Sequence, residues 1–307
     1  MKTLDMLKKA MNGGYGILAL NFSTLEVLKG LVKAAEETNA PLMLAISRDA
    51  MSFIGPEYLK GMIAATRATT AAQISFHLDH GRSFEDIVQA IDIGCDSVMI
   101  DASSKPYEEN IKLTKKVVDY AHARGIQVEA ELGKLVGIED HVNVAAGEGA
   151  YTDPDQALDF VMRTGIDSLA VAVGTSHGAY KFEGPPKLRF DILQKIQDKL
   201  PDTPLVLHGA STVNPKYINR FEALGGNLEG AQGVFPEIIK QAVKEYNVSK
   251  INSDTDLRLI YTMSMLEHIT KNPNNIDPRK SLAYATEQIE KCAKEKILSL
   301  YGKNKAL

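Results

Sequence analysis

The stretch "QISFHLDHGRSFEDIVQAIDIG", residues 73–94, indicates one complete strand followed by one helix. It opens with a short, mostly apolar run of the kind that forms a buried strand. Ser83 is suited to be the N-cap of the helix and Gly94 to end it, and the apolar residues between them recur at helical spacing. The strand finishes in Asp79 and His80, which makes its end a candidate functional site as well.

Similar apolar, β-branched runs recur along the chain, and segments with helical spacing separate them. These further runs are residues 16–21, 41–47, 97–101, 126–133, 168–174, 204–209 and 248–254. Strands that alternate with helices are parallel strands joined by crossovers, and eight such units predict a closed (β/α)8 barrel. An open doubly wound sheet would alternate too, but no GxGxxG motif follows the first strand. We expect one barrel domain over 1–307, with a helical extension over about 255–307.

The composition limits the possible classes of function. The chain has 307 residues, of which 44% are hydrophobic, and its net charge of −4 argues against a nucleic-acid-binding protein. No apolar run approaches the roughly 18 residues of a membrane span. The only two cysteines, Cys95 and Cys292, form no CxxC pair, which suits a reducing compartment. We therefore expect a cytoplasmic protein with no membrane or nucleic-acid partner.

Most of the predicted strands end in polar or ionisable residues, although a parallel barrel strand should be nearly all apolar. These residues are Asn21, Ser47, Asp79, His80, Asp101, Glu129, Glu131, His177, His208, Asn252 and Asp254. All of them lie at or just beyond carboxyl ends of strands, the face on which barrels of this architecture build their active sites. A ring of such residues predicts a site at the barrel mouth.

Four histidines, His77, His80, His177 and His208, belong to these strand ends. A single strand-end histidine is more often a hydrogen-bonded structural residue. Three imidazoles from separate strands, however, leave open coordination positions of the kind a catalytic zinc ion needs. His77 shares a strand face with Asp79, whereas His80 reaches that face only if the backbone turns, which Gly81 would make easy.

The remaining features are loops. The Gly- and Ser-rich segments at 174–181 and 208–211 offer backbone N–H groups that can cradle an oxyanion, and Lys181 strengthens the first. The connection over 133–154 is too long for a simple turn and is typical of a functional lid. No strand end carries a lysine suited to Schiff-base chemistry, because Lys250 lies within its strand pattern.

Six motifs occur in order with barrel spacing: "HLDHG" (77–81), "VMIDAS" (98–103), "VEAELG" (128–133), "GTSHG" (174–178), "LVLHGAS" (205–211) and "INSDTDLR" (251–258). Together they resemble the class II, metal-dependent fructose-1,6-bisphosphate aldolases over nearly the whole chain. This resemblance implies a barrel enzyme of glycolysis and gluconeogenesis that reversibly cleaves fructose 1,6-bisphosphate. The products would be dihydroxyacetone phosphate and glyceraldehyde 3-phosphate.

The resemblance also implies roles for individual residues. His80, His177 and His208 match the ligands of a catalytic Zn²⁺ ion, with Asp101 and Glu131 as second-shell or alternative metal positions. Asp79 matches the acid/base at the C4 hydroxyl, and Glu139 matches a mobile carboxylate that handles the proton of the enediolate carbon. The implied substrate-binding residues are Asn21, Ser47, Gly178, Lys181, Gly209, Ser211, Asn252, Asp254, Arg258 and Arg279.

Among these residues, Gly178, Lys181, Gly209 and Ser211 match the site of the ketose-side phosphate, with a monovalent cation, Na⁺ or K⁺, nearby. Arg258, Arg279 and Ser47 match contacts to the distal phosphate, some of them made across a subunit interface, so a homodimer or homotetramer is expected. The sequence departs from the family pattern at Thr24, Arg48 and Asp49, which bears on substrate preference.

Two other enzymatic interpretations remain at this point. A tagatose-1,6-bisphosphate aldolase would differ only in the stereochemistry at C4 that it accepts. More remotely, a zinc-dependent barrel hydrolase could use the same imidazoles to activate water. A non-catalytic relative is disfavoured because Asp79, Glu139 and all three expected ligands are present.

Overall fold

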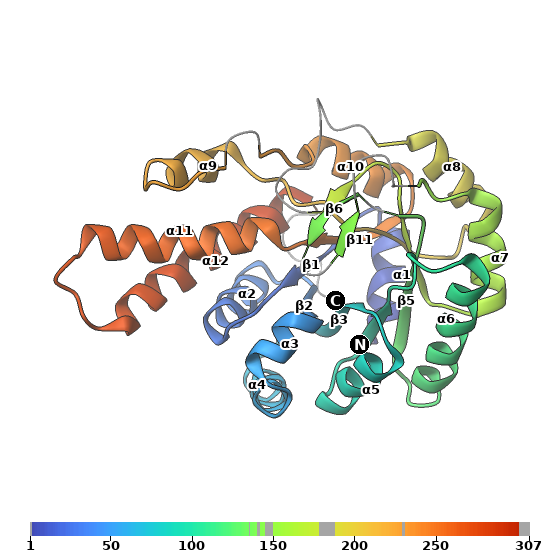
Figure 1. The fold of residues 1–307 in the computed structure, drawn as a ribbon, viewed down its shortest axis with the longest axis horizontal. Coiled ribbons are helices and arrows are strands. Elements are labelled where there is room, and N and C mark those ends of the chain that lie inside the picture. The colour runs from blue at the N-terminus through green and yellow to red at the C-terminus, as the bar shows by residue number, and fades with distance from the viewer. Residues whose placement is uncertain are drawn as a thin grey trace.

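In the computed structural model, each of the eight apolar runs forms one strand of a closed, all-parallel barrel, as predicted (Figure 1). The strand order around the barrel is β1-β11-β10-β8-β5-β4-β3-β2. The strands are β1 (Ile17–Asn21), β2 (Leu42–Ser47), β3 (Ile74–Gly81), β4 (Ser97–Ile100), β5 (Gln127–Leu132), β8 (Ser168–Val171), β10 (Leu205–Leu207) and β11 (Val248–Ser253). The structure describes residues 2–134, 136–139, 142–144, 150–177, 188–228 and 231–300, with the backbone alone for 136–139, 142–144 and 177.

Helices surround this barrel. They are α1 (Thr3–Gly13), α2 (Leu25–Thr38), α3 (Arg48–Ile54), α4 (Pro56–Thr69), α5 (Phe84–Ile93), α6 (Tyr107–His122), α7 (Pro154–Thr164), α8 (Phe190–Lys199), α9 (Pro215–Glu222), α10 (Pro236–Glu245), α11 (Thr255–Lys271) and α12 (Pro278–Leu300). Helix α5 begins where its sequence predicts, because Ser83 and Asp86 form a capping box, and Gly94 ends it in the left-handed region at φ +103°. No helix within the described ranges is long and apolar enough to cross a membrane.

Helix α1 lies against the amino-terminal ends of the barrel strands. The Thr3 hydroxyl is 2.6 Å from the hydroxyl of Ser75 near the start of β3, and the backbone N–H of Leu4 donates to the side chain of Gln127, the first residue of β5. Met6 and Leu7 on the same helix are buried in the core. The amphipathic amino-terminal helix therefore covers the end of the barrel opposite the carboxyl ends of the strands.

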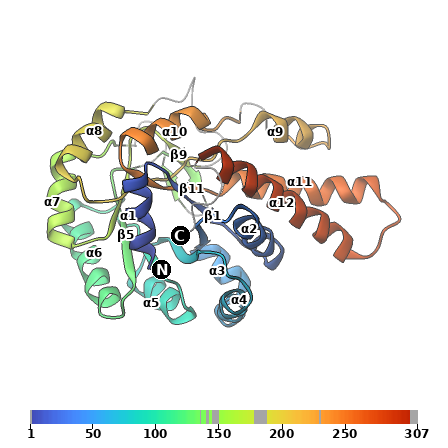
Figure 2. The ribbon, with the colours of Figure 1, turned by 180° about the vertical axis from the view of Figure 1, so that it is seen from behind.

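Helices α11 and α12 form an antiparallel pair that extends away from the barrel as an arm, visible from both sides (Figures 1 and 2). The later part of α12 packs on α2, where Gly30 lets the two helices approach closely: a Cβ at Gly30 would be 2.9 Å from the Ile289 side chain and from the Thr286 carbonyl oxygen. The helical prediction for about 255–307 is confirmed over α11 and α12, and residues 301–307 lie outside the described ranges.

The long connection after β5 contains more regular structure than its composition indicated. It includes β6 (Val136–Glu139) and β7 (Val142–Val144), which pair as an antiparallel hairpin. β6 also pairs in parallel with β9 (Ser176–His177), so that Gly137 is opposite His177. Since β9 follows shortly after β8, this small sheet belongs to the carboxyl-terminal side of the barrel.

Candidate metal centre and active site

The end of β3 is irregular at the two residues that carry its chemistry. The pairing of β3 with β4 shifts register between Leu78 and Gly81, and His80 adopts a left-handed conformation with φ +51°. The turn that we expected at Gly81 therefore occurs at His80 itself, and Gly81 is needed for space, because a Cβ there would be 2.9 Å from the Met99 carbonyl oxygen. The bulge cancels the alternation of side chains, so Asp79 and His80 face the same site.

Asp79 is held by amides from two other strands. Its Oδ2 accepts a hydrogen bond from Asn21 Nδ2 on β1 at 2.8 Å, and its Oδ1 accepts one from Asn252 Nδ2 on β11 at 2.9 Å. The carbonyl oxygens of both asparagines are buried and have no hydrogen-bond partner among the described residues. These two residues, expected only to contact substrate, thus also orient the carboxylate, and their free oxygens can still accept from a substrate hydroxyl.

The ring of His80 is oriented by Asp101. His80 Nδ1 is 3.0 Å from Asp101 Oδ2, and Asp101 also accepts hydrogen bonds from the backbone and hydroxyl of Ser103. Burial acts to lower the pKa of His80, but the charges of Asp79, Asp101 and Glu131 prevail and raise it to about 10 in the metal-free protein. Burial acts against the ionised form of Asp101, yet its bonds with His80 and Ser103 hold the pKa of that carboxyl well below its ordinary value.

The ring of His208 is oriented by Glu129. His208 Nε2 lies 2.8 Å from Glu129 Oε1, and His208 Nδ1 lies 3.9 Å from Asp79 Oδ1. The rings of His208 and His80 meet edge to face, with their centroids 4.5 Å apart. Each imidazole therefore has one nitrogen bonded to an outer carboxylate and the other nitrogen on the side of Asp79.

Two groups of side chains have the donor atoms and the spacing for a divalent metal ion. Asp79, His80 and His208 each offer one donor atom, and these atoms lie within 4.8 Å of one another. His80, Asp101 and Glu131 form a second group by the same measure. Glu131 Oε2 is buried with no hydrogen-bond partner among the described residues, and burial, followed by the charge of Asp101, raises the pKa of Glu131 well above its ordinary value. A bound cation would supply the missing partner of Glu131, so this donor set fits a metal such as zinc.

Several expected site residues lie wholly or partly outside the described residues. Gly178 and Lys181 lie outside the described residues, as do the side chains of His177 and Glu139. The backbone nevertheless brings the last two close in register, because Gly137, two residues before Glu139, is opposite His177 in the β6–β9 pair.

The loop after β10, residues 208–213, is shaped by a close backbone contact and by Asp256. Gly209 has φ +61°, and a Cβ there would be 2.4 Å from the Ser176 carbonyl oxygen. Asp256, buried at the start of α11, accepts hydrogen bonds from the backbone N–H groups of Thr212 and Val213 at 2.9 and 2.8 Å. It therefore fixes the loop that carries Gly209 and Ser211.

Asp256 in turn pairs with Lys296 of α12, whose Nζ is 2.6 Å from its Oδ2. It also accepts from the hydroxyl of Ser253, which is 3.4 Å from the Ser211 hydroxyl. Sequence reasoning missed both members of this pair. Asp256 lies within the motif "INSDTDLR" and could have been noticed, but nothing in the sequence pattern marks Lys296.

The other expected substrate-binding residues are spread around the mouth and beyond it. Ser47 caps α3, where its hydroxyl accepts a hydrogen bond from the backbone of Ala50. Asp254 and Arg258 form an ion pair at 2.6 Å, with the arginine side chain half exposed. Arg279, in the first turn of α12, is 86% exposed and pairs with Asp277, so within one chain it is not part of the mouth.

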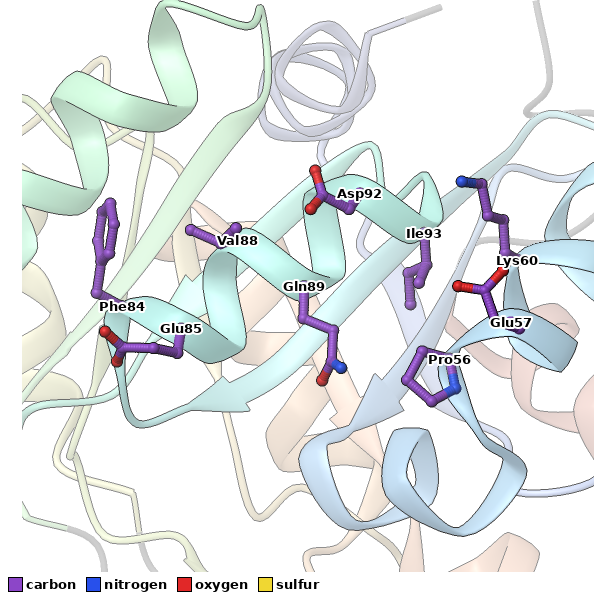
Figure 3. Close-up of a pocket in the computed structure, with 9 residues that line it drawn as sticks. All are labelled: Pro56, Glu57, Lys60, Phe84, Glu85, Val88, Gln89, Asp92 and Ile93. Atoms are coloured by element: carbon purple, nitrogen blue, oxygen red, sulfur yellow. The ribbon is translucent and has the colours of Figure 1, made fainter.

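A groove of about 440 Å³ lies outside the barrel, between α4 and α5. Pro56, Glu57 and Lys60 of α4 face residues from Phe84 to Ile93 of α5 across it (Figure 3). None of its lining residues belongs to the ring of strand ends, so this groove is separate from the candidate metal centre.

Comparison with known proteins shows the family of the chain. The family model for class II fructose-bisphosphate aldolases matches residues 1–305. The chain belongs to the class II fructose-bisphosphate aldolase family. This class II aldolase is 44% identical to the fructose-bisphosphate aldolase of Thermus caldophilus over 97% of both chains. It is 41% identical to the enzyme of that name from Giardia intestinalis, over 95% of this chain and 90% of the relative.

Solved structures of aldolases have the same fold as this chain. The YdjI aldolase from Escherichia coli K12 superposes on this class II aldolase with a TM-score of 0.80 and 32% identity, over 99% of this chain and 98% of the other. A putative fructose-1,6-bisphosphate aldolase from Coccidioides immitis gives a TM-score of 0.79 at 28% identity, over 98% and 97% of the two chains. The predictions of fold, family and aldolase activity are confirmed, and the barrel-hydrolase interpretation is not favoured.

Proposed function

We propose that this class II aldolase reversibly cleaves fructose 1,6-bisphosphate into dihydroxyacetone phosphate and glyceraldehyde 3-phosphate, as a cytoplasmic enzyme of glycolysis and gluconeogenesis. The observation that carries the proposal is the placement of Asp79. Its carboxylate is fixed by two amides and lies 4.0 and 3.9 Å from the nearer nitrogens of His80 and His208. An acid/base group is thereby positioned directly beside the donor atoms of the metal centre.

His80, His208 and His177 would hold the zinc ion, and Asp101 and Glu131 would serve as orienting or alternative ligands. When bound, zinc acts as a Lewis acid that stabilises the negative charge developing on the ketose oxygens as the C3–C4 bond breaks. Asp101 and Glu129 hold the two described imidazoles in place from outside, which is the usual arrangement around metal-bound histidines.

Asp79 would take the proton from the C4 hydroxyl during cleavage and return it during condensation. Asn21 and Asn252 keep the carboxylate from turning away, since each amide bonds a different oxygen. Glu139 would exchange the proton of the enediolate carbon, as a carboxylate carried by the β6–β7 hairpin next to β9. Positioning by neighbours of this kind accounts for a large part of enzymatic rate enhancement.

The two phosphates would be bound at opposite sides of the mouth. The loop with Gly209 and Ser211, together with Gly178, Lys181 and a Na⁺ or K⁺ ion, would bind the ketose-side phosphate. Ser47, Asp254 and Arg258 would lie toward the distal end of the substrate. Arg279 would reach the distal phosphate of a neighbouring subunit, because it is exposed on the protruding arm. We therefore propose a homodimer or homotetramer, which sedimentation equilibrium tests directly.

The decisive assay is turnover of fructose 1,6-bisphosphate in a coupled reaction, with and without a chelator. Activity should be lost with the chelator and return when zinc is added back. The variant Asp79→Ala should lose cleavage while retaining bound zinc, and full activity in that variant would refute the assignment. Parallel rates on tagatose 1,6-bisphosphate test the preference at C4, and a faster rate on tagatose 1,6-bisphosphate would contradict the proposal.

A further inference from the structure

A buried lysine lies one layer below the metal centre, inside the barrel. Lys250, in the middle of β11, is 0% exposed. Its Nζ is 2.9 and 2.8 Å from the two carboxylate oxygens of Glu129 and 3.1 Å from His77 Nε2. A lysine ammonium has three N–H donors, so these contacts use all of them. The same Glu129 is the partner of His208.

The directions of these hydrogen bonds follow from the ammonium group, which can only donate. His77 Nε2 must therefore accept, so the proton of this imidazole is on Nδ1, where it donates to the Ser97 hydroxyl at 2.8 Å. Glu129 accepts from Lys250 through both of its oxygens. Since both oxygens already act as acceptors, the proton of the contact with His208 is on His208 Nε2, which donates to Oε1.

This chain of donors and acceptors reaches the metal centre. With the proton on Nε2, the lone pair of His208 is on Nδ1, the nitrogen that lies 3.9 Å from Asp79. A metal-bound histidine needs one unprotonated ring nitrogen facing the ion, and the hydrogen bond of the other nitrogen selects which one. Glu129 makes this selection by accepting from Nε2, and Lys250 bonds both of its oxygens and thereby fixes their orientation.

We propose that Lys250 is a positioning residue for the metal centre: by holding Glu129, it sets the tautomer and the ring orientation of His208. The inference rests on the proposed role of His208 as a zinc ligand. Lys250 itself is 121 residues from Glu129 in the sequence and touches neither Asp79 nor the substrate-binding loop in the contacts described. Its effect on the enzyme should therefore be on metal binding.

The test compares zinc affinities of metal-free protein, measured by competition with a chromophoric chelator. Lys250→Met removes the ammonium at similar side-chain length and should weaken zinc binding about tenfold, the lower end of the range for outer partners of metal ligands. The matched control is Lys294→Met, since Lys294 likewise bonds a buried carboxylate, Glu290, but on α12 beside α2, away from the metal centre and from the phosphate loop. That variant should bind zinc as the unmodified protein does.

Lys250→Met leaves Glu129 buried without its lysine partner, and weaker zinc binding could then reflect misfolding. A second variant removes this ambiguity. Lys250→Met combined with Glu129→Gln removes both charges with little change in volume. Its amide can turn and offer either an acceptor or a donor to His208, so zinc binding should again be weakened about tenfold. Unchanged zinc affinity in this double variant, or equal weakening in Lys294→Met, would overturn the proposal.

A direct readout is the nitrogen-15 spectrum of the histidine rings in the metal-free protein. His208 should be protonated at Nε2 in the unmodified protein and should become a mixture of tautomers in the double variant. Protonation of His208 at Nδ1 in the unmodified protein would refute the inference. His208→Ala tests the proposed metal site itself. Zinc binding that survives this change would contradict the role of His208 as a ligand, whereas the outcomes above concern the role of Lys250.

Discussion

The decisive single residue is His80, because its left-handed backbone places it and Asp79 on one site. A β-branched or bulky residue would be strained at φ +51°, whereas histidine tolerates it better than most. The strain lies where the barrel strand ends and where the metal centre begins. Residues in sparsely populated backbone regions cluster at functional sites. Asp79, the residue before His80, is likewise held in one orientation by hydrogen bonds from Asn21 and Asn252.

Replacing Asn21 by Leu should lower kcat about 10- to 100-fold, because Asp79 loses one of the two amides that orient it, and displacement of about 1 Å has such effects. Steady-state kinetics on fructose 1,6-bisphosphate measure the loss, and metal analysis should find the zinc content unchanged. The control Asn219→Leu makes the same change on the exposed surface of α9 and should leave kcat as it is. A normal kcat in Asn21→Leu would show that Asn252 alone is sufficient to hold Asp79.

The two thiols should be unreactive in the folded protein. Burial raises the pKa of Cys95 and of Cys292 to about 12, so both remain protonated near neutral pH, and the thiolate is the reactive form. Ellman's reagent should therefore detect no thiol in the native enzyme and both thiols after unfolding in urea. Rapid modification of Cys95 in the native state would instead support a reactive thiol at that position.

At the scale of elements, the carboxyl-terminal helix α12 is tied to the candidate phosphate loop. Lys296 of α12 bonds Asp256 of α11, which in turn holds the backbone of Thr212 and Val213. Val213 has φ +43°, an unfavourable conformation for a β-branched residue, and the bond to Asp256 helps to maintain it. Helix α12 thus stabilises the barrel mouth from outside.

Replacing Lys296 by Met should destabilise the fold by about 3–5 kcal/mol, because Asp256 remains buried without its cation. The KM for fructose 1,6-bisphosphate should also rise, since the loop that carries Ser211 loses its support. Urea unfolding and steady-state kinetics measure the two effects. An unchanged KM would show that the loop holds its shape without α12.

The stability effect of Lys296→Met should depend on pH. Burial opposes ionisation of Asp256, but the charge of Lys296 and hydrogen bonds from Thr212 and Ser253 prevail and hold its pKa below the ordinary value. A carboxylate with a depressed pKa contributes stability above its unfolded pKa of about 3.9, and this contribution is lost as the pH falls through the folded value. The difference in unfolding free energy between Lys296→Met and the unmodified protein should therefore shrink in acid; a constant difference would contradict the pairing.

The whole molecule is built in layers along the barrel axis. Helix α1 covers the amino-terminal ends of the strands, and the polar layer of His77, Glu129 and Lys250 lies above it. The metal centre with His208 comes next, at the carboxyl ends. In this arrangement the lower end contributes stability without contacting substrate, whereas the chemistry belongs to the mouth.

Leu7→Ala should therefore destabilise the protein and leave its activity intact. Leu7 is buried in α1, and deletion of a buried leucine side chain costs about 2–5 kcal/mol. Thermal unfolding should show the loss, while kcat and KM at room temperature should be unchanged, because α1 lies at the opposite end of the barrel from the metal centre. Lys8→Ala, on the exposed side of the same helix, should alter neither property. A lowered kcat in Leu7→Ala would indicate that the layers are coupled.

The barrel could be predicted from the amino-acid sequence alone, because apolar periodicity and helix caps are local signals. All eight strands and the helix that begins after Ser83 lie where those signals indicate. The same signals predict polar residues at the carboxyl ends of the strands, and of these the structure brings together Asn21, Asp79, His80, His208 and Asn252. The small sheet of β6, β7 and β9 could not be predicted, because its pairing joins segments without a distinctive pattern.

The hydrogen bonds between the site residues, by contrast, became known only from the folded chain. Asp79 is bonded to Asn252 across 173 residues of sequence, and Lys250 to Glu129 across 121. No local pattern specifies such pairs, because they depend on strand register and on the bulge at His80, which overrides the alternation of side chains. The strand pattern excluded Lys250 from Schiff-base chemistry but gave no sign of its partner, whereas the fold places it against Glu129, the carboxylate that bonds His208.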